Sequence, residues 1–169
     1  MNELESLKPI ERKRLILFIS GSSNKNAQSD LVLNELVLIE SENYLNKNGH
    51  NYSVKSAKKH QLKKLGKCYA NAAQMIYKGY GYVEGYVKYK NSGLKSAHAW
   101  NVAKDGSHID FTFDNADDLE YFGAIIPERD VILTGLKNGG IWYCAIPFLS
   151  NDQNKVLKDL QLCRIGNKV

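Results

Sequence analysis

Residues 66–113 read GKCYANAAQMIYKGYGYVEGYVKYKNSGLKSAHAWNVAKDGSHIDFTF, and this stretch changes character along its length. Its first part, about Cys68 to Lys78, is rich in alanine and predicts a helix that ends before Gly79 and Gly81. The next part, Tyr82–Tyr89, contains aromatic and β-branched residues with roughly alternating polarity, which is typical of a strand. The stretch therefore predicts a helix that leads directly into a sheet.

Two further strands are predicted to follow and to form a hairpin. Ser96–Ala103 and His108–Phe113 flank the dipeptide Asp105-Gly106, which commonly forms the tight turn between two antiparallel strands. Together with the strand before them, they predict an antiparallel meander. Because helices are expected before and after this sheet along the chain, the chain is assigned to the α+β class.

The flanking regions predict mainly helices. Pro9–Ile19 is expected to be a short helix with proline in its first turn, and Ser29-Asp30 is expected to cap a longer helix that ends at Gly49. The polar stretch 21–26 predicts the loop between them. The elements expected after the meander are a helical turn at Ala116–Tyr121, a helix from Pro127 that ends before Gly139-Gly140, a strand at Ile141–Phe148 and a last helix capped by Ser150-Asn151-Asp152.

Length and composition indicate one globular domain. The chain has 169 residues, of which 43% are hydrophobic, and this is enough for one core. We expect residues 1–169 to form a single domain, with a helical N-terminal part at 1–50 and the core at 65–148. The start lacks the order of a signal peptide, and no apolar run approaches the roughly 20 residues of a membrane span. The expected location is the cytoplasm, or the host cytoplasm if the frequent lysine and asparagine reflect a phage genome.

The charge of the chain is mildly basic and gives little support for nucleic-acid binding. There are 23 Lys and Arg against 18 Asp and Glu, for a formal net charge of +5. The excess is mostly lysine, whereas arginine is better suited to bidentate recognition of phosphates and bases. A basic run without acidic residues is interpreted as a solvated face, with attraction to an acidic partner as the alternative. It consists of Lys55, Lys58, Lys59, Lys63, Lys64 and Lys67.

Three residues of the deciding stretch have the chemistry of a cysteine-dependent enzyme. Cys68 lies at the start of the predicted helix, His98 on the second predicted strand, and Asp110 on the third. A helix N-terminus and a neighbouring imidazolium both favour the thiolate, which is the reactive form of cysteine. A carboxylate on the far ring nitrogen fixes the tautomer of the imidazole. The hairpin spacing therefore predicts that His98 and Asp110 meet, with Cys68 beside them.

Four short segments, taken in order, resemble the transglutaminase-like core of the papain-like cysteine-enzyme superfamily. That core has a Gly-x-Cys-x-x-x-Ala helix start, a Gly-Tyr strand, a His-Ala-Trp strand and an Asp-x-Thr strand. The matching segments here are Gly66-Lys67-Cys68-Tyr69-Ala70-Asn71-Ala72, Tyr82-Val83-Glu84-Gly85-Tyr86, His98-Ala99-Trp100-Asn101-Val102 and Asp110-Phe111-Thr112. The resemblance covers about Leu65 to Phe113, and the stretch Tyr121-Phe122-Gly123 is similar to the segment that follows the core in small bacterial members.

The resemblance implies a papain-like fold, in which a cysteine-bearing helix packs on an antiparallel sheet, and it implies a role for each residue. Cys68 would be the nucleophile, His98 the general base and acid, and Asp110 the residue that orients His98. The backbone N–H of Cys68 would donate to the oxyanion, and Gln61 is a weaker candidate because its spacing is one residue off. The chain departs from the frequent Asp-Pro-Thr-Trp pattern, since it reads Asp110-Phe111-Thr112-Phe113.

The other reactive side chains are expected to be structural. Cys144 in an apolar strand and Cys163 at a helix end are interpreted as packed, inert thiols. Three cysteines at long spacings fit neither a disulfide framework nor a zinc site, so no cofactor or metal is expected. His108 shares a face with Asp110 on a regular strand and is the alternative base. Glu84 is expected to form a surface cross-strand pair with a lysine; the alternative is that it faces the core, where it would need a partner.

The expected function is acyl transfer at protein or peptide amides: hydrolysis, deamidation or transamidation. The alternative is a catalytically silent binding module of the same fold, with which a bacterial or phage protein holds a host partner. Nucleic-acid binding rests on charge alone, because the sequence contains no recognised nucleic-acid-binding motif. The substrate and the oligomeric state are left open.

Overall fold

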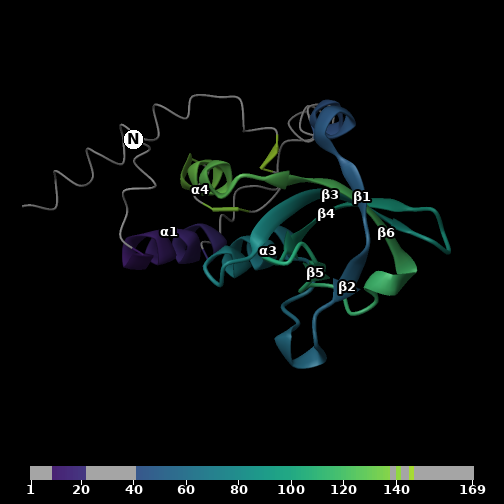
Figure 1. Ribbon diagram of the computed structural model, residues 1–169, viewed down its shortest axis with the longest axis horizontal. Helices are drawn as coiled ribbons and strands as arrows, with labels where there is room; N and C mark the ends of the chain where they lie inside the picture. The colour runs from purple at the N-terminus through teal and green to yellow at the C-terminus, as the bar shows by residue number, and fades with distance from the viewer. Residues whose placement is uncertain (1–8, 22–40, 138–139, 142–144, 147–169) are drawn as a thin grey trace, which may run out of the picture.

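A curled six-stranded sheet is the central feature of the computed structural model (Figure 1). The structure describes residues 9–21, 41–137, 140–141 and 145–146. The strands are β1 (His50–Tyr52), β2 (Val54–Ser56), β3 (Gly81–Tyr89), β4 (Lys95–Val102), β5 (His108–Asp110) and β6 (Leu119–Ile126). Their order in the sheet is β1–β6–β3–β4–β5–β2.

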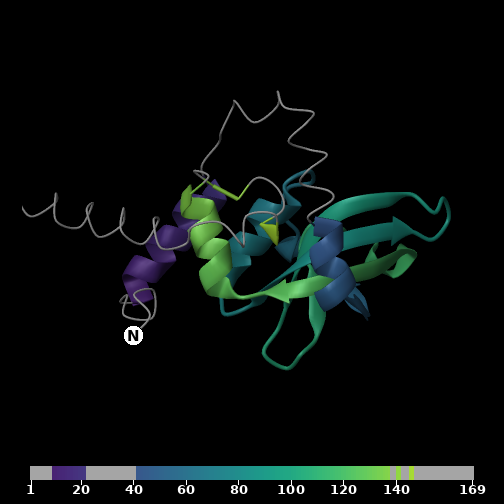
Figure 2. The same cartoon turned by 90° about the horizontal axis from the view of Figure 1, so that it is seen from above.

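Three helices gather at one end of the sheet. They are α1 (Pro9–Gly21), α3 (Cys68–Ile76) and α4 (Glu128–Lys137), and Figures 1 and 2 show α1 and α4 side by side there. Residues 41–48 are also helical. Two short 3-10 helices, η1 (Lys59–Gln61) and η2 (Ala116–Asp118), lie in the connections. An ion pair between Arg12 and Glu128 joins α1 to α4.

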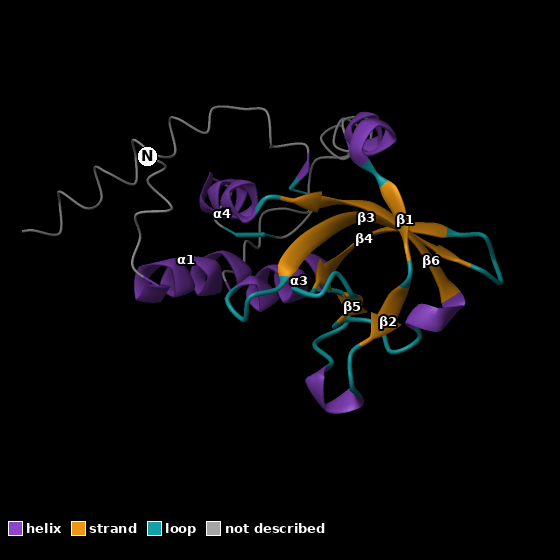
Figure 3. Ribbon diagram, in the orientation of Figure 1, coloured by secondary structure: helices purple, strands orange, loops and turns teal. Residues whose placement is uncertain are grey.

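Residues 50–56 close the sheet on itself. β1 pairs antiparallel with β6, whereas β2, which follows after the single residue Ser53, pairs parallel with β5. Since β6 and β5 are the outer strands of the β6–β3–β4–β5 part, one short extended segment bridges both of its edges (Figure 3). The sheet is therefore mixed, which corrects the expectation of an antiparallel sheet; the α+β class holds.

The two faces of the sheet contribute to separate cores, because successive side chains of a strand point to opposite sides. The outer face packs against the helices: Ala72 and Ala73 of α3 lie in one core with Ala99 of β4 and Ala124 of β6. The inner face is enclosed by the curl of the sheet. Its buried side chains are Val54, Val83, Val87, Trp100, Ala116, Leu119 and Tyr121.

Two glycines allow the strands to approach closely on the inner face. Gly85 lies opposite both His98 and Gly123 in the strand register. A Cβ atom on Gly123 would come within 2.5 Å of Trp100 Cη2, and one on Gly85 within 2.1 Å of the Phe122 carbonyl oxygen. Because these distances are far below van der Waals contact, only glycine fits at either position.

The helix, the three strands and the turn predicted for residues 66–113 are confirmed, with small changes at their ends. α3 begins at Cys68 as predicted and ends at Ile76, and β5 ends at Asp110 instead of Phe113. The turn is a tight one: Gly106 has φ +83°, and Ser107 N–H donates to the Asp105 side chain. The predicted helix from Pro127 is also present, as α4.

The sequence prediction is wrong at β6 and incomplete at β1 and β2. The helical turn expected at Ala116–Tyr121 ends at Asp118, and the strand Leu119–Ile126 begins there. The burial of β6 alternates from Leu119 to Gly123 and breaks at Ala124, so only part of the strand has a regular alternation. β1 and β2 have three residues each and form through pairing with strands far away in the sequence.

Several other predictions fall wholly or partly outside the described residues. Of the predicted helix that ends at Gly49, residues 41–48 are described and are helical. Of the strand expected at Ile141–Phe148, only Ile141, Ala145 and Ile146 are described, and none of the three is in a strand. The helix expected after Ser150 lies outside. Among the helices that are described, none has the length and apolarity to cross a membrane.

Candidate active site

The site begins with the first turn of α3. Gly66 has φ +74°, a left-handed backbone conformation that glycine adopts without steric cost. Lys67 is the N-cap residue, and its carbonyl oxygen accepts the first helical hydrogen bond, from Asn71 N–H at 2.8 Å. Cys68 is therefore in the first turn, where backbone N–H groups lack helical partners, and it is half-buried.

His98 and Asp110 meet on the inner face of the sheet. His98 Nε2 lies 2.6 Å from Asp110 Oδ2, and the two side chains are 2% and 0% exposed. The hairpin through the Asp105-Gly106 turn brings them together, since it pairs β4 with β5 antiparallel. The contact predicted between these two residues is therefore present.

Cys68 reaches the same imidazole from the helix. Cys68 is close enough to His98 for its hydrogen-bonding capacity and charge to raise the pKa of the imidazole. Because Asp110 engages Nε2, Nδ1 is the ring nitrogen left available to Cys68. The structure thus brings the three residues together in the order Cys68, His98, Asp110.

The first turn of α3 approaches the inner-face histidine where β5 has ended. Alternation along β4 puts His98 and Ala99 on opposite faces, and the body of α3 packs on the Ala99 side. β5 pairs with β4 only at Asn101 and Val102, so it stops short of His98. The first turn of α3 therefore contacts His98 past the end of β5.

The Asp110 carboxylate accepts four hydrogen bonds. Oδ1 accepts the backbone N–H groups of Thr112 at 2.7 Å and Phe113 at 3.1 Å. Oδ2 accepts His98 and the hydroxyl of Tyr121, the latter at 2.8 Å. Burial alone would raise the pKa of Asp110, but the hydrogen bond and charge of His98, together with the two backbone groups, hold that pKa below its usual value.

The environment of His98 favours its charged form. Burial lowers the pKa of His98, but hydrogen bonds to Asp110 and Cys68 and the charges of both outweigh burial and raise it to about 9. The ring of Phe113 stacks on the imidazole, with centroids 4.5 Å apart and an interplanar angle of 19°. At neutral pH this site therefore holds an imidazolium between the Cys68 side chain and a carboxylate.

Three further residues complete the site, namely Asn71, Thr112 and Tyr121, and none of them was predicted to have a role. Asn71 Nδ2 donates to Thr112 Oγ1 at 3.0 Å and to the Lys64 carbonyl oxygen at 2.8 Å, which ties α3 to the segment after β5. The Asp-x-Thr pattern was a signal for Thr112. Tyr121 belongs to the stretch Tyr121-Phe122-Gly123 that resembles the segment after the core, but residues 116–121 were expected to form a helical turn, so no contact with Asp110 was predicted.

Two other candidates from the sequence are Gln61, for the oxyanion, and His108, as the alternative base. Gln61 is exposed at the end of η1, and within the described residues no hydrogen bond joins its side chain to Cys68 or His98. His108 Nδ1 accepts the indole N–H of Trp100 at 3.0 Å, and its ring stacks on Tyr52. Burial lowers the pKa of His108. Because its Nδ1 is engaged by Trp100, and no hydrogen bond joins it to Cys68 or Asp110 among the described residues, the structure favours a structural role for His108.

The remaining predictions concern thiols, metals and the basic run. Cys144 and Cys163 lie outside the described residues. In the described part of the chain, no group of three or more His, Cys, Asp or Glu side chains is arranged to hold a metal ion. Most of the basic run is exposed, namely Lys55, Lys58, Lys59, Lys64 and Lys67, whereas Lys63 is half-buried and donates to Gln74.

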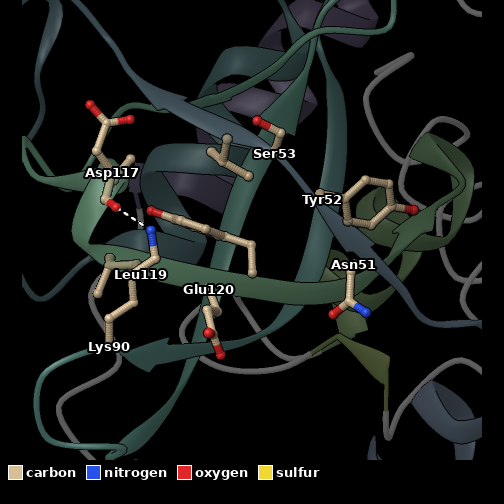
Figure 4. Close-up of a pocket in the computed structure, with 10 residues that line it drawn as sticks. Asn51, Tyr52, Ser53, Lys90, Asp117, Leu119 and Glu120 are labelled. Carbon is tan, nitrogen blue, oxygen red and sulfur yellow. Dashed lines mark hydrogen bonds between the residues drawn. The ribbon is translucent and has the colours of Figure 1, made fainter.

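A cavity of about 520 Å³ lies between the β1–β2 segment, η2 and the start of β6 (Figure 4). Tyr52, Glu120 and Tyr121 line it together with Lys90 and Asp117, and Lys90 Nζ donates to the Asp117 carbonyl oxygen. A second cavity, of about 300 Å³, lies where α1 faces the end of α3 and the start of α4. Neither cavity is lined by the Cys68–His98 pair.

Comparison with models of known protein families, with curated proteins and with solved structures finds no match to this chain. The interpretation of the site therefore rests on its own geometry and on the resemblance of its short motifs.

Proposed function

We propose that this chain is a cysteine-dependent acyl-transfer enzyme that acts on protein or peptide amides. The observation that supports the proposal is the cluster of Cys68, His98 and Asp110: His98 is hydrogen-bonded to Asp110, and Cys68, in the first turn of a helix, is close enough to raise the pKa of His98. A thiol beside an imidazolium, with a carboxylate on the far nitrogen, is the arrangement that nucleophilic cysteine enzymes require. The motif resemblance to transglutaminase-like enzymes supports the same reaction class.

In the first half of the reaction, the Cys68 thiolate attacks the carbonyl carbon of a substrate amide. The oxyanion that forms is within reach of the unpartnered backbone N–H groups of the first turn of α3, the N–H of Cys68 among them. The C–N bond then breaks, and the leaving amine takes the proton of the His98 imidazolium. This leaves a thioester on Cys68 and a neutral His98 still held by Asp110.

In the second half, water or an amine attacks the thioester and gives a proton to His98. The products are a free acid or a new amide, and the Cys68 thiolate is restored beside the imidazolium. Asp110 stays ionised throughout, because its four donors and the His98 charge stabilise the carboxylate. Hydrolysis, deamidation and transamidation share these steps and differ only in the leaving and attacking groups.

Alkylation by iodoacetamide tests the proposal. Cys68 is expected to react at neutral pH at least about tenfold faster in the native chain than in the chain unfolded by urea, because only the native fold supplies His98. Peptide mapping by mass spectrometry assigns the modified cysteine, and Cys144 and Cys163 serve as internal references. His98→Ala should remove the acceleration, and an acceleration that survives this change would contradict the proposal.

Incubation with a mixture of glutamine-containing peptides tests the acyl step itself. Acid quenching followed by mass spectrometry of the intact protein should show a covalent adduct in the wild type. The adduct should be released by hydroxylamine, as a thioester is, and it should be absent from Cys68→Ala.

A catalytically silent binding module is the second candidate, and one observation favours it. The His98 side chain is only 2% exposed, so the imidazole presents almost no surface to a substrate. If this reading is right, Cys68 reacts no faster in the native chain than in the unfolded one, and no peptide adduct forms. Cys68→Ala would then keep the full biological effect of the protein.

A further inference from the structure

The hydroxyl of Tyr121 is a feature of the site that the reaction above does not use. It is 2.8 Å from Asp110 Oδ2, the same oxygen that lies 2.6 Å from His98 Nε2. We propose that Tyr121 is a positioning residue, whose hydroxyl holds the Asp110 carboxylate in the orientation and charge distribution that His98 requires. The catalytic importance of this role rests on the proposed function, whereas the contact itself does not.

The geometry leaves the carboxylate no freedom while Tyr121 is present. Oδ1 is held by two backbone N–H groups, those of Thr112 and Phe113, and Oδ2 by one ring N–H and one hydroxyl. Without the hydroxyl, His98 is the only donor left on Oδ2. The negative charge on this oxygen would then be shared with fewer donors.

Tyr121 is itself rigidly placed. It is 2% exposed, it lies opposite Tyr52 and Val87 in the register of β6, and its ring packs edge-on against Trp100 at 5.1 Å. Burial raises the pKa of Tyr121, as do the charge and the hydrogen bond of Asp110. The phenol therefore stays protonated and remains a donor throughout the working pH range.

The charged and titratable groups around this pair come from several elements. Asp110 is on β5, His98 on β4 and Cys68 on α3, and their mutual contacts are described above. Tyr89 at the end of β3 and Asp117 in η2 also raise the pKa of the Tyr121 phenol through their charge, so both keep it protonated. None of them supplies a further donor to Asp110 among the described hydrogen bonds.

The structure predicts the direction of the effect on His98. When His98 is charged, it neutralises Asp110; when His98 is neutral, the carboxylate depends on its other donors. Loss of the Tyr121 hydroxyl therefore destabilises the neutral form of His98 more than the charged form. Tyr121→Phe should consequently raise the titration midpoint of His98, by about 0.5–1 pH unit.

The experiment compares Tyr121→Phe with a matched control, Tyr82→Phe. The Tyr82 hydroxyl also donates to a buried carboxylate, Glu84 Oε2 at 3.0 Å, and Tyr82 is 1% exposed, but it lies on the outer face and away from His98. The His98 ring is followed by NMR from pH 5 to 11, and its signals are assigned with His98→Gln. The rate of Cys68 alkylation is measured over the same range.

The expected result is an upward shift of the His98 midpoint in Tyr121→Phe and none in Tyr82→Phe. Replacement of Tyr121 by 3,5-difluorotyrosine, a stronger donor of nearly the same shape, should shift the His98 midpoint downward. This second variant tests the proposal even if Tyr121→Phe does not fold. Midpoints that equal the wild-type value in both Tyr121 variants would overturn the proposal.

The two readouts separate this inference from the proposed function. If Tyr121 acts as described but Cys68 is not a nucleophile, the NMR midpoint moves while Cys68 remains slow in every variant. If Cys68 is a nucleophile but Tyr121 does not act on Asp110, Cys68 is alkylated fast in the wild type, and the His98 midpoint of Tyr121→Phe equals that of the wild type.

Discussion

At the scale of single residues, Asp110 is the residue on which most of the site depends. It is fully buried, and each of its oxygens accepts two hydrogen bonds from different parts of the chain. A buried carboxylate with this many donors stays ionised, and its charge in turn keeps His98 protonated. The chemistry of Cys68 thus depends on a residue that it does not touch.

Asp110→Asn should test this dependence. The amide nitrogen cannot accept from His98, so the imidazolium loses its main partner and Cys68 alkylation at neutral pH should slow by at least about tenfold. The free energy of unfolding, measured with urea, should fall by about 2–4 kcal/mol. Asp117→Asn, at an exposed position, is the control and should change neither. An unchanged alkylation rate in Asp110→Asn would move the orienting role to another residue.

His98 also makes stability depend on pH. Its pKa rises from 6.5 in the unfolded chain to about 9 in the fold, so its stabilising contribution is fully present below about pH 6.5 and is lost as the pH rises through about 9. The difference of about 2.5 units corresponds to at most about 3 kcal/mol. Urea unfolding of the wild type and His98→Gln between pH 6 and 10 checks this. The gap in stability between them should narrow above pH 8, and a gap that widens would contradict the sign.

At the scale of elements, the contact between β3, β4 and β6 brings the inner-face side chains together. Gly85, His98 and Gly123 lie side by side across these three strands. The two glycines allow the backbones to approach, and the indole of Trp100 occupies the space over Gly123. The position of His98 on the inner face therefore depends on two residues without side chains.

Gly123→Ala should be costly for this reason. Its Cβ would lie 2.5 Å from Trp100 Cη2 and 2.6 Å from the Glu84 carbonyl oxygen, and neither can move without disturbing the sheet. The expected loss in the free energy of unfolding is about 2–3 kcal/mol. Gly93→Ala is the control, because Gly93 has φ +69° but open space around it, and it should cost about 1 kcal/mol. Equal losses of unfolding free energy in the two variants would show that the backbone of β6 shifts to accommodate a side chain at Gly123.

At the scale of the whole molecule, one buried side chain connects the sheet to a distant part of the chain. Glu84 in the middle of β3 is fully buried, which corrects the expectation of a surface pair with lysine. Its Oε2 accepts Ala145 N–H at 2.7 Å, and its Oε1 accepts Ile146 N–H at 3.1 Å. Glu84 thereby holds residues that follow α4 against the outer face of the sheet.

Glu84→Gln should weaken this connection. The amide nitrogen of glutamine would face a backbone N–H, which leaves a buried donor without an acceptor, and the expected cost is about 3 kcal/mol. Glu120→Gln is the control, because Glu120 pairs with Lys88 at the surface and its loss should cost less than about 1 kcal/mol. Hydrogen exchange should show loss of protection at Ala145 and Ile146. Full protection at these amides in Glu84→Gln would mean that other contacts hold the segment.

Local patterns in the sequence were enough to predict the central part of this molecule. Alanine-rich composition bounded by glycines defines α3, and alternating aromatic and β-branched residues define β3 and β4, because both depend on neighbours within a few positions. The Asp105-Gly106 turn fixes the pairing of β4 with β5, so the contact between His98 and Asp110 also follows from local sequence. The sequence by itself therefore determined the helix, the hairpin and the order of the three site residues.

Only the tertiary structure decided how the sheet closes and what surrounds the triad. β1 and β2 are too short to carry a pattern of their own, and they exist because β6 and β5 provide hydrogen-bond partners for them. Tyr121 reaches Asp110 only because the curl of the sheet turns β6 toward β5, which no spacing in the sequence encodes. Pairing between distant strands depends on the loop closures and packing of the whole chain, and for that reason the environment of the site became visible only in the fold.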